Sequence, residues 1–216
     1  MENQSKSSAW APTLEMISSA TNQVQVLSND PIIGERTLAE LQMSDTSTLG
    51  AVALNSGGLL IDNGWLRILG SGHAEICGDL RSWNGLGEHP VTLSFKPQGY
   101  FIVAYDVAGG FFALHAQSPT VFYFAPDTLD WEDTEKGYTD FLDWALNGDL
   151  EQYYSTFRWK GWEREVGELS GSQAILIYPF LWTKEGRRIH QSERKAILVE
   201  ELWDLQQDMR KQGFGS

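Results

Sequence analysis

Three aspartates, Asp62, Asp106 and Asp127, have the residue type and the positions that general acid–base chemistry requires, because each lies at a predicted strand end or turn. Such chemistry needs two carboxyl groups in different environments, one protonated and one ionised. Asp62 and Asp127 also suit a second role, since an aspartate in a turn accepts hydrogen bonds from nearby backbone N–H groups. The chain holds 29 acidic residues, so some carboxylates meet by chance, and we predict no catalytic residue.

The histidines show no metal-binding pattern, because no two of them have the i, i+4 spacing that places two imidazoles on one helical face. They are His73, His89, His115 and His190. The turn Gly70-Ser71-Gly72 resembles half of a phosphate-binding loop, but the further glycine and the Lys-Ser/Thr pair are missing. We therefore predict no metal site and no cofactor.

Cys77 is the only cysteine, which excludes an intramolecular disulfide and a thiolate metal cluster. Its acidic neighbours Glu75 and Asp79 would raise the thiol pKa, whereas a nucleophilic cysteine needs a lowered pKa. We expect a small buried side chain here.

An acidic segment carries more than half of the net charge of −13. Residues 127–151 contain nine carboxylates and one lysine, a net charge of −8. This charge repels phosphate backbones and anionic lipid and attracts cationic surfaces, so we predict a basic protein partner and neither nucleic acid nor membrane. A solvated face without a partner is the alternative. Aromatic side chains surrounded by charge are typical of tight interfaces. The predicted partner-binding residues are Asp130, Trp131, Glu132, Asp133, Glu135, Asp140, Asp143 and Trp144.

A tight hairpin is the clearest local feature. The predicted strands Leu59–Asp62 and Trp65–Leu69 flank Asn63-Gly64, two residues that tolerate the positive φ of a type I′ turn. Further segments rich in β-branched and aromatic residues, joined by turns at residues 109–110 and 117–119, predict an antiparallel meander. Their ranges are Val91–Phe95, Tyr100–Val107, Phe111–His115 and Thr120–Phe124, with a separate buried strand at Ala174–Tyr178.

Two helices are predicted before the hairpin. Thr13 is placed to cap a helix that ends at Ala20. The pattern Thr37-x-x-Glu40 is a capping-box signature, in which the two side chains bond each other's free backbone N–H groups, and it predicts a helix from Leu38 to about Met43.

Two more helices are predicted after the meander. An apolar stripe at i, i+3, i+4, i+7 and i+8 predicts a helix that Gly148 ends, with Asp140 and Asp143 facing solvent and Trp144 at the edge of the stripe. The stripe consists of Tyr138, Phe141, Leu142, Ala145 and Leu146. A last helix is predicted from about Glu193 to Lys211, with an apolar face. That face consists of Leu198, Leu202, Leu205 and Met209.

The segment from residue 57 to 72, GGLLIDNGWLRILGSG, resembles the core of a bacterial family of unknown function whose members have about this length. The segments YDVAGGFFAL (105–114), YFAPDTL (123–129) and FLDW (141–144) fit the same resemblance, which extends from about Thr37 to Trp182. More distantly, the order of an NG turn, strands around a GG turn and a Phe-Leu helix is similar to the SUKH superfamily. That resemblance implies a SUKH-like α+β fold and the toxin-neutralising role of its many immunity proteins.

A chain of 216 residues with 42% hydrophobic residues can bury a core without disulfides. We predict a flexible leader at residues 1–12 and one α+β domain at 13–216. In this domain an antiparallel β-meander sheet packs with helices, and a helical, aromatic-rich extension begins at about residue 149. The sequence opens without a basic region and apolar run, and no window approaches the roughly 18 apolar residues of a membrane span. The expected location is the cytoplasm.

These observations favour a cytosolic protein-binding domain that is not an enzyme. The leading hypothesis is an immunity or antitoxin protein whose acidic face covers a basic toxin such as a nuclease. The alternative is a small-molecule-binding domain or a hydrolytic enzyme, with the glycine-rich hairpin and the aromatic segment 153–162 lining a pocket.

Overall fold

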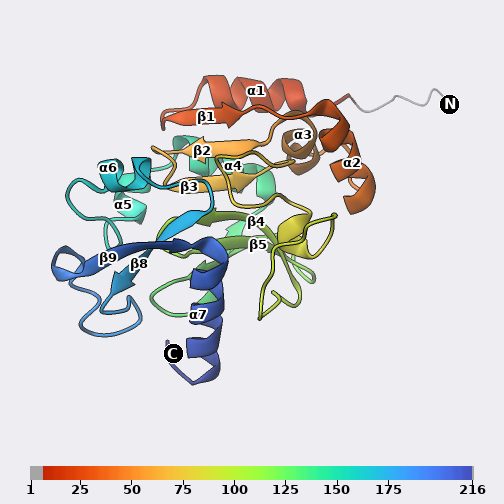
Figure 1. Ribbon diagram of the computed structural model, residues 1–216. Coiled ribbons are helices and arrows are strands. Elements are labelled where there is room, and N and C mark those ends of the chain that lie inside the picture. Colours follow the sequence, from red (N-terminus) through yellow and green to blue (C-terminus); the bar gives the residue numbers. More distant parts are fainter. Residues whose placement is uncertain (1–6, 216) are drawn as a thin grey trace.

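Seven strands form an antiparallel sheet in chain order in the computed structural model, which describes residues 7–215 (Figure 1). They are β1 (Val24–Leu27), β2 (Gly58–Ile61), β3 (Leu66–Leu69), β4 (Tyr100–Asp106), β5 (Phe111–His115), β6 (Val121–Ala125) and β7 (Asp130–Lys136). Every neighbouring pair is antiparallel, which confirms the predicted meander. A second sheet pairs β8 (Gln173–Tyr178) with β9 (Glu193–Leu198).

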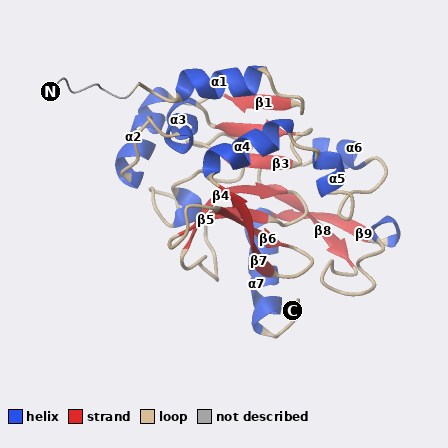
Figure 2. Cartoon of the chain, turned by 180° about the vertical axis from the view of Figure 1, so that it is seen from behind, coloured by secondary structure: helices blue, strands red, loops and turns tan. Residues whose placement is uncertain are grey.

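Helices cover both faces of the large sheet. On one face, α1 (Trp10–Ser18), α3 (Thr48–Asn55) and α4 (Tyr138–Asn147) pack against one another. The other face is covered by α7 (Val199–Lys211), which lies in front in Figure 1, whereas α4 lies in front in the reversed view of Figure 2. The remaining helices are α2 (Pro31–Leu41), η1 (Ser82–Asn84), α5 (Leu150–Tyr153), α6 (Trp162–Gly167) and η2 (Ile189–Gln191).

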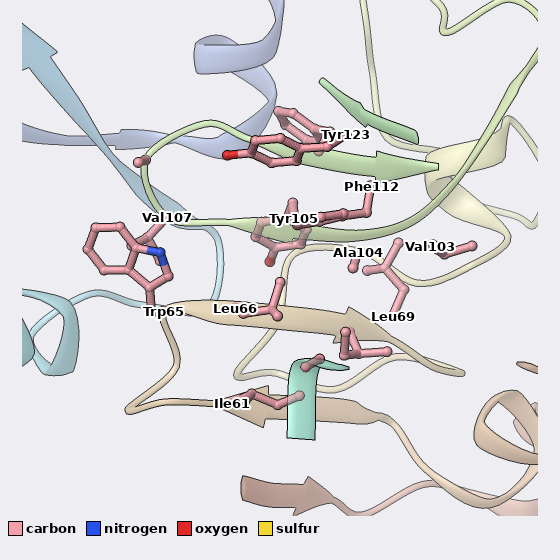
Figure 3. Packing of buried hydrophobic residues seen from close by; sticks show 14 of the residues in the cluster. Ile61, Trp65, Leu66, Leu69, Val103, Ala104, Tyr105, Val107, Phe112 and Tyr123 are labelled. Atoms are coloured by element: carbon pink, nitrogen blue, oxygen red, sulfur yellow. The ribbon is translucent and has the colours of Figure 1, made fainter. Parts of the chain in front are cut away.

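Adjacent side chains on β5 show how the two faces are filled. Phe112 contacts Phe141 of α4, with ring centroids 4.8 Å apart, whereas Phe111 contacts Trp203 of α7 at 4.7 Å. Successive residues of a strand point to opposite faces, so these two aromatic rings anchor the two helical layers. Phe112 and Tyr123 lie side by side on neighbouring strands, with ring centroids 4.5 Å apart (Figure 3).

Two local predictions are confirmed. Asn63 and Gly64 have φ angles of 55° and 78°, as a type I′ turn requires, and the two strands pair as a hairpin. The strands are shorter than predicted, because Asp62 also has a positive φ of 52°, so the last pair is Ile61 with Leu66 and the loop contains residues 62–65. The predicted apolar stripe of α4 is buried throughout, while Asp140 is exposed. The residue types of the turn and the 3.6-residue spacing of apolar residues are therefore sufficient to predict these two elements from the sequence.

The predicted strand Val91–Phe95 is wrong, because this segment is irregular. Its backbone is bonded to α7 and not to another strand. Ser94 N–H donates to the Asp204 carboxylate at 2.9 Å and Trp203 Nε1–H donates to the Phe95 carbonyl at 2.7 Å. The backbone of this segment therefore forms hydrogen bonds with side chains of α7, where a strand would form them with a neighbouring strand.

The predicted capping box at Thr37 is also wrong. Helix α2 begins at Pro31, and its cap is Asp30, which accepts a hydrogen bond from Ile32 N–H. Thr37 is buried within the helix and donates to the Ile33 carbonyl at 2.8 Å. Helix α1 begins at residue 10 instead of 13, so it overlaps the predicted leader, whose residues 1–6 lie outside the described part.

The predicted C-terminal helix is two elements. Residues 193–198 form β9, and only 199–211 are helical. Leu198 therefore belongs to a strand and is 39% exposed, while Trp203 and Gln206 join Leu202 among the buried residues of α7. Sequence analysis also missed β1, α3 and β7.

Candidate functional site

A cavity of about 260 Å³ lies between α4 and β7, the strand at one edge of the large sheet. Aromatic rings from β5, β6, α4 and α5 form its walls, and polar side chains of β7 complete it. The aromatic residues are Phe112, Tyr123, Phe141, Trp144 and Tyr153, and the polar ones are Glu132, Asp133, Thr134 and Lys136.

Trp144 and Tyr153 form one wall of this cavity, in an edge-to-face arrangement with ring centroids 4.7 Å apart. The short turn between α4 and α5 brings them together. A Cβ at Gly148 would come within 2.6 Å of the Trp144 ring, so only glycine allows the chain to turn this closely. Asp149 then caps α5 by accepting a hydrogen bond from Gln152 N–H.

Two carboxylates of β7 line the cavity. Glu132 and Asp133 form no ion pair within residues 7–215. Tyr153 has a pKa raised above its usual range, first by burial of its hydroxyl and then by the charges of Asp106, Glu132 and Asp127. The cavity therefore has a negative potential, which Lys136 at its rim reduces only in part.

Asp106 is completely buried behind Tyr123. Its Oδ1 accepts hydrogen bonds from the backbone N–H groups of Ala108 and Gly110, and its Oδ2 accepts one from the Tyr123 hydroxyl at 2.9 Å. Burial raises the carboxyl pKa, and these hydrogen bonds oppose the shift. A Cβ at Gly110 would overlap both the carboxylate and the Tyr123 hydroxyl. Asp106 thus fixes the β4–β5 turn beneath the cavity.

The predicted partner-binding residues do not form one cluster. Glu132, Asp133 and Trp144 meet at the cavity, and Asp140 and Asp143 lie exposed on α4 nearby. Asp130 instead forms an ion pair with Arg210 of α7, at 2.6 Å. Trp131 lies on the α7 face, stacked on Tyr100 with ring centroids 4.0 Å apart. Glu135 is exposed at a positive φ of 59° where β7 is irregular.

The two tryptophans of the acidic segment therefore lie on opposite faces of the sheet. Trp131 is also near Trp203 of α7, whereas Trp144 is near Phe112 and Phe141 of the other layer. They do not combine into a single aromatic anchor. Only Trp144 contributes to the cavity.

Asp62 holds a buried arginine. Its Oδ2 accepts a hydrogen bond from Arg158, whose guanidinium lies over the rings of Trp65 and Trp162, 4.8 and 4.1 Å from their centroids. Glu151, which is largely exposed, accepts a second hydrogen bond from the same guanidinium. The aromatic segment 153–162 thus packs on the first hairpin around Arg158.

A separate cavity of about 310 Å³ borders the first hairpin and α6, with Asn63, Arg67 and Glu163 among its lining residues. Arg67 is held by the carbonyls of Gly64, Gly171 and Gln173. The aromatic rings of residues 153–162 do not line this cavity.

Cys77 and the histidines do not form a reactive or metal-binding site in the described residues. Cys77 is buried, and burial and then Glu200 raise its thiol pKa, so it has the inert environment that was expected, although the acidic neighbour is not Glu75 or Asp79. No metal-binding cluster of histidine, cysteine and carboxylate side chains is present in the described part of the chain. None of the described helices has the length and apolar character to cross a bilayer.

Sequence reasoning missed Tyr153, Phe112 and Lys136 as parts of the cavity. The adjacent pair Phe111-Phe112 was a usable signal, because two large rings next to each other on a strand require two covered faces. Tyr153 and Lys136 had no such signal, since their positions depend on how β7 and α5 sit on the sheet.

The whole chain has relatives of similar length. Residues 2–202 match the family described as "Protein of unknown function DUF2625". A "Putative uncharacterized protein YbfG" of Escherichia coli (strain K12) is 41% identical over 211 residues, covering 94% of this chain and 93% of the relative. An "Uncharacterized protein" of Haemophilus influenzae is 38% identical over 202 residues, covering 89% and 86%. No solved structure matches the chain.

Proposed function

The chain belongs to the DUF2625 family of proteins of unknown function, and from that premise we propose that it binds a basic protein, with one arginine or lysine side chain of the partner entering the cavity between α4 and β7. The observation that carries this proposal is the combination of aromatic walls and unpaired carboxylates in one cavity. The faces of aromatic rings attract cations, and a carboxylate forms an ion pair with a cation bound there.

The size of the cavity supports a side chain as its occupant. Pockets for drug-sized ligands typically have volumes of about 300–1,000 Å³, and this one has about 260 Å³. A long, narrow cation from a protein surface fits such a volume. Exposed carboxylates of α4 add attraction around it, because Asp140 and Asp143 pair with no cation within residues 7–215.

The class of partner follows from the predicted SUKH resemblance, which points to toxin neutralisation. A basic toxin presents many arginine and lysine side chains, and an opposite charge accelerates association with it. We propose that the protein is an immunity protein that covers such a toxin by its acidic face.

Co-expression with a panel of basic bacterial nuclease toxins, each toxic to the host cell on its own, tests this function. We expect the protein to protect cells, and the double charge reversal Asp140→Lys/Asp143→Lys to slow association with the purified toxin about tenfold at low salt. Both side chains are exposed, so the free energy of unfolding should change by no more than about 0.5 kcal/mol. Glu35→Lys/Glu193→Lys is the matched control, because both side chains are exposed, lie on α2 and β9, and form no ion pair within residues 7–215. Cells that die equally with and without the protein would contradict the proposal.

A further inference from the structure

A second, larger cavity of about 700 Å³ opens among three segments that are distant in the sequence. They are the turn that follows β6, the chain that follows α5 and the loop that joins β8 to β9. Phe157, Leu181 and Ile189 supply its apolar lining, and each is less than a tenth exposed. The cavity therefore offers a buried apolar surface to a ligand that enters from solvent.

Cationic side chains border this apolar lining. Arg187 and Arg188 line the cavity together with His190 and one acidic residue, Asp127. Neither guanidinium forms an ion pair or a side-chain hydrogen bond with any residue between 7 and 215, although the chain contains 29 acidic residues. Two free guanidinium groups beside an apolar surface are suited to an anionic group.

The loop that carries these arginines is fixed by its own hydrogen bonds. The Thr183 hydroxyl donates to the Phe180 carbonyl at 2.7 Å and accepts from Gly186 N–H at 3.1 Å. A Cβ at Gly186 would overlap the Phe180 carbonyl, so the loop closes tightly at this glycine. Arg188 N–H donates to the Glu185 carbonyl at 3.1 Å. A loop held in this way loses little backbone entropy when a ligand binds to its arginines.

We propose that this cavity binds a small molecule that joins an apolar body to a phosphate or carboxylate group. The apolar body packs on Phe157, Leu181 and Ile189, and the anion pairs with Arg187 and Arg188. The proposed ligand has the opposite charge to the partner of the α4–β7 cavity, so the two sites take different molecules. Asp127 opposes the anion and limits its affinity.

Calorimetric titration with phenyl phosphate and with benzoate tests the proposal and distinguishes the two anionic groups. We expect saturable one-to-one binding of at least one of them, and binding about tenfold weaker for inorganic phosphate and for phenol, each of which lacks half of the ligand. Arg187→Gln/Arg188→Gln should weaken binding about tenfold. Asp127→Asn should tighten it, because the opposing charge is removed.

Arg164→Gln is the matched control, because Arg164 lies exposed on α6, outside the lining of this cavity. Circular dichroism of each variant establishes that it is folded before titration. The proposal is overturned if neither phenyl phosphate nor benzoate saturates the protein. It is also overturned if the double arginine variant, in folded form, binds as tightly as Arg164→Gln.

Discussion

At the residue scale, the carboxylate of Asp106 fixes the turn between β4 and β5. It accepts two backbone hydrogen bonds and one from the Tyr123 hydroxyl, all within the core. The sequence placed Asp106 correctly at the end of a strand, and the structure adds the Tyr123 partner that satisfies its second oxygen. Burial could not be read from the residue itself, because it depends on distant segments that pack against the turn, such as Leu202 and Gln206 of α7 beside Gly109.

We expect Asp106 to make stability depend on pH in a defined direction. Its native pKa is raised by burial, so above about pH 4 the unfolded chain releases this proton before the native protein does. The carboxyl therefore lowers the free energy of unfolding as pH rises, until pH passes its native pKa. Asp106→Asn should remove this slope in denaturant titrations between about pH 4 and 7.

Asp106→Ala is the companion variant. It leaves two backbone N–H groups and a hydroxyl without an acceptor, which should cost about 2–4 kcal/mol at every pH. Asparagine keeps the two backbone hydrogen bonds through its Oδ1, and its amide N–H donates to the Tyr123 oxygen in place of the original bond. Its cost should therefore be clearly smaller than that of alanine. Equal losses for the two variants would mean that the hydrogen bonds at this turn contribute little.

Arg158 provides a matched pair of variants, because two carboxylates share its guanidinium. Asp62 is mostly buried beside it, with 21% of its side chain exposed, whereas the Glu151 side chain is 80% exposed. Asp62→Asn should cost about 2–3 kcal/mol, since a buried cation loses its buried partner. Glu151→Gln should cost no more than about 0.5 kcal/mol. Denaturant midpoints measure both, and a larger loss for Glu151→Gln would refute this assignment.

At the element scale, β7 has two roles that its sequence alone could not separate. The segment Asp130–Lys136 is acidic and has low strand propensity, so its sequence predicts a charged face and no strand. It pairs only with β6, which leaves its other edge open. Charges and a bulge on such an edge prevent pairing with other chains, and the same charges line the cavity.

Replacing acidic residues of β7 by neutral residues that favour strands tests whether the charges protect this edge of the sheet. We expect Glu132→Thr/Asp133→Thr, at two positions that pair regularly with β6, to remain folded but to self-associate at high protein concentration, which light scattering measures. Asp140→Asn/Asp143→Asn, which removes the same charge from α4, is the control and should stay monodisperse to the same extent as the unaltered protein. Equal behaviour of the two double variants would show that net charge alone, and not the strand edge, governs solubility.

Elements with strong local signals were predictable from sequence, and those defined by distant partners were not. The hairpin is predicted by the positive φ angles that Asn63 and Gly64 tolerate, and α4 is predicted by the 3.6-residue spacing of its apolar side chains. Residues 91–95 have strand-forming composition but are held by Asp204 and Trp203 of α7. Asp30, and not Thr37, caps α2, because the backbone at Thr37 is already helical.

At the scale of the whole molecule, two cavities of opposite character lie on one chain of net charge −13. The α4–β7 cavity combines aromatic rings with carboxylates, and the larger cavity combines an apolar lining with free guanidinium groups. Tyr153 lies in the first and Ser155 in the second, only two residues apart in the sequence. The sequence indicated the acidic region, but neither cavity could be derived from it, because each is built from segments that only the fold brings together.

A titration with N-acetyl-arginine amide, observed through the indole N–H signal of Trp144, tests the central claim most directly. We expect saturable binding with a dissociation constant of about 1 mM, typical of a single cationic contact worth about 4 kcal/mol, and no saturation with N-acetyl-glutamine amide. Glu132→Gln should weaken binding of the arginine compound, and Lys136→Gln should strengthen it, because these residues line the same cavity with opposite charges. Equal shifts with both compounds, or binding unaffected by either substitution, would contradict a cation-binding cavity between α4 and β7.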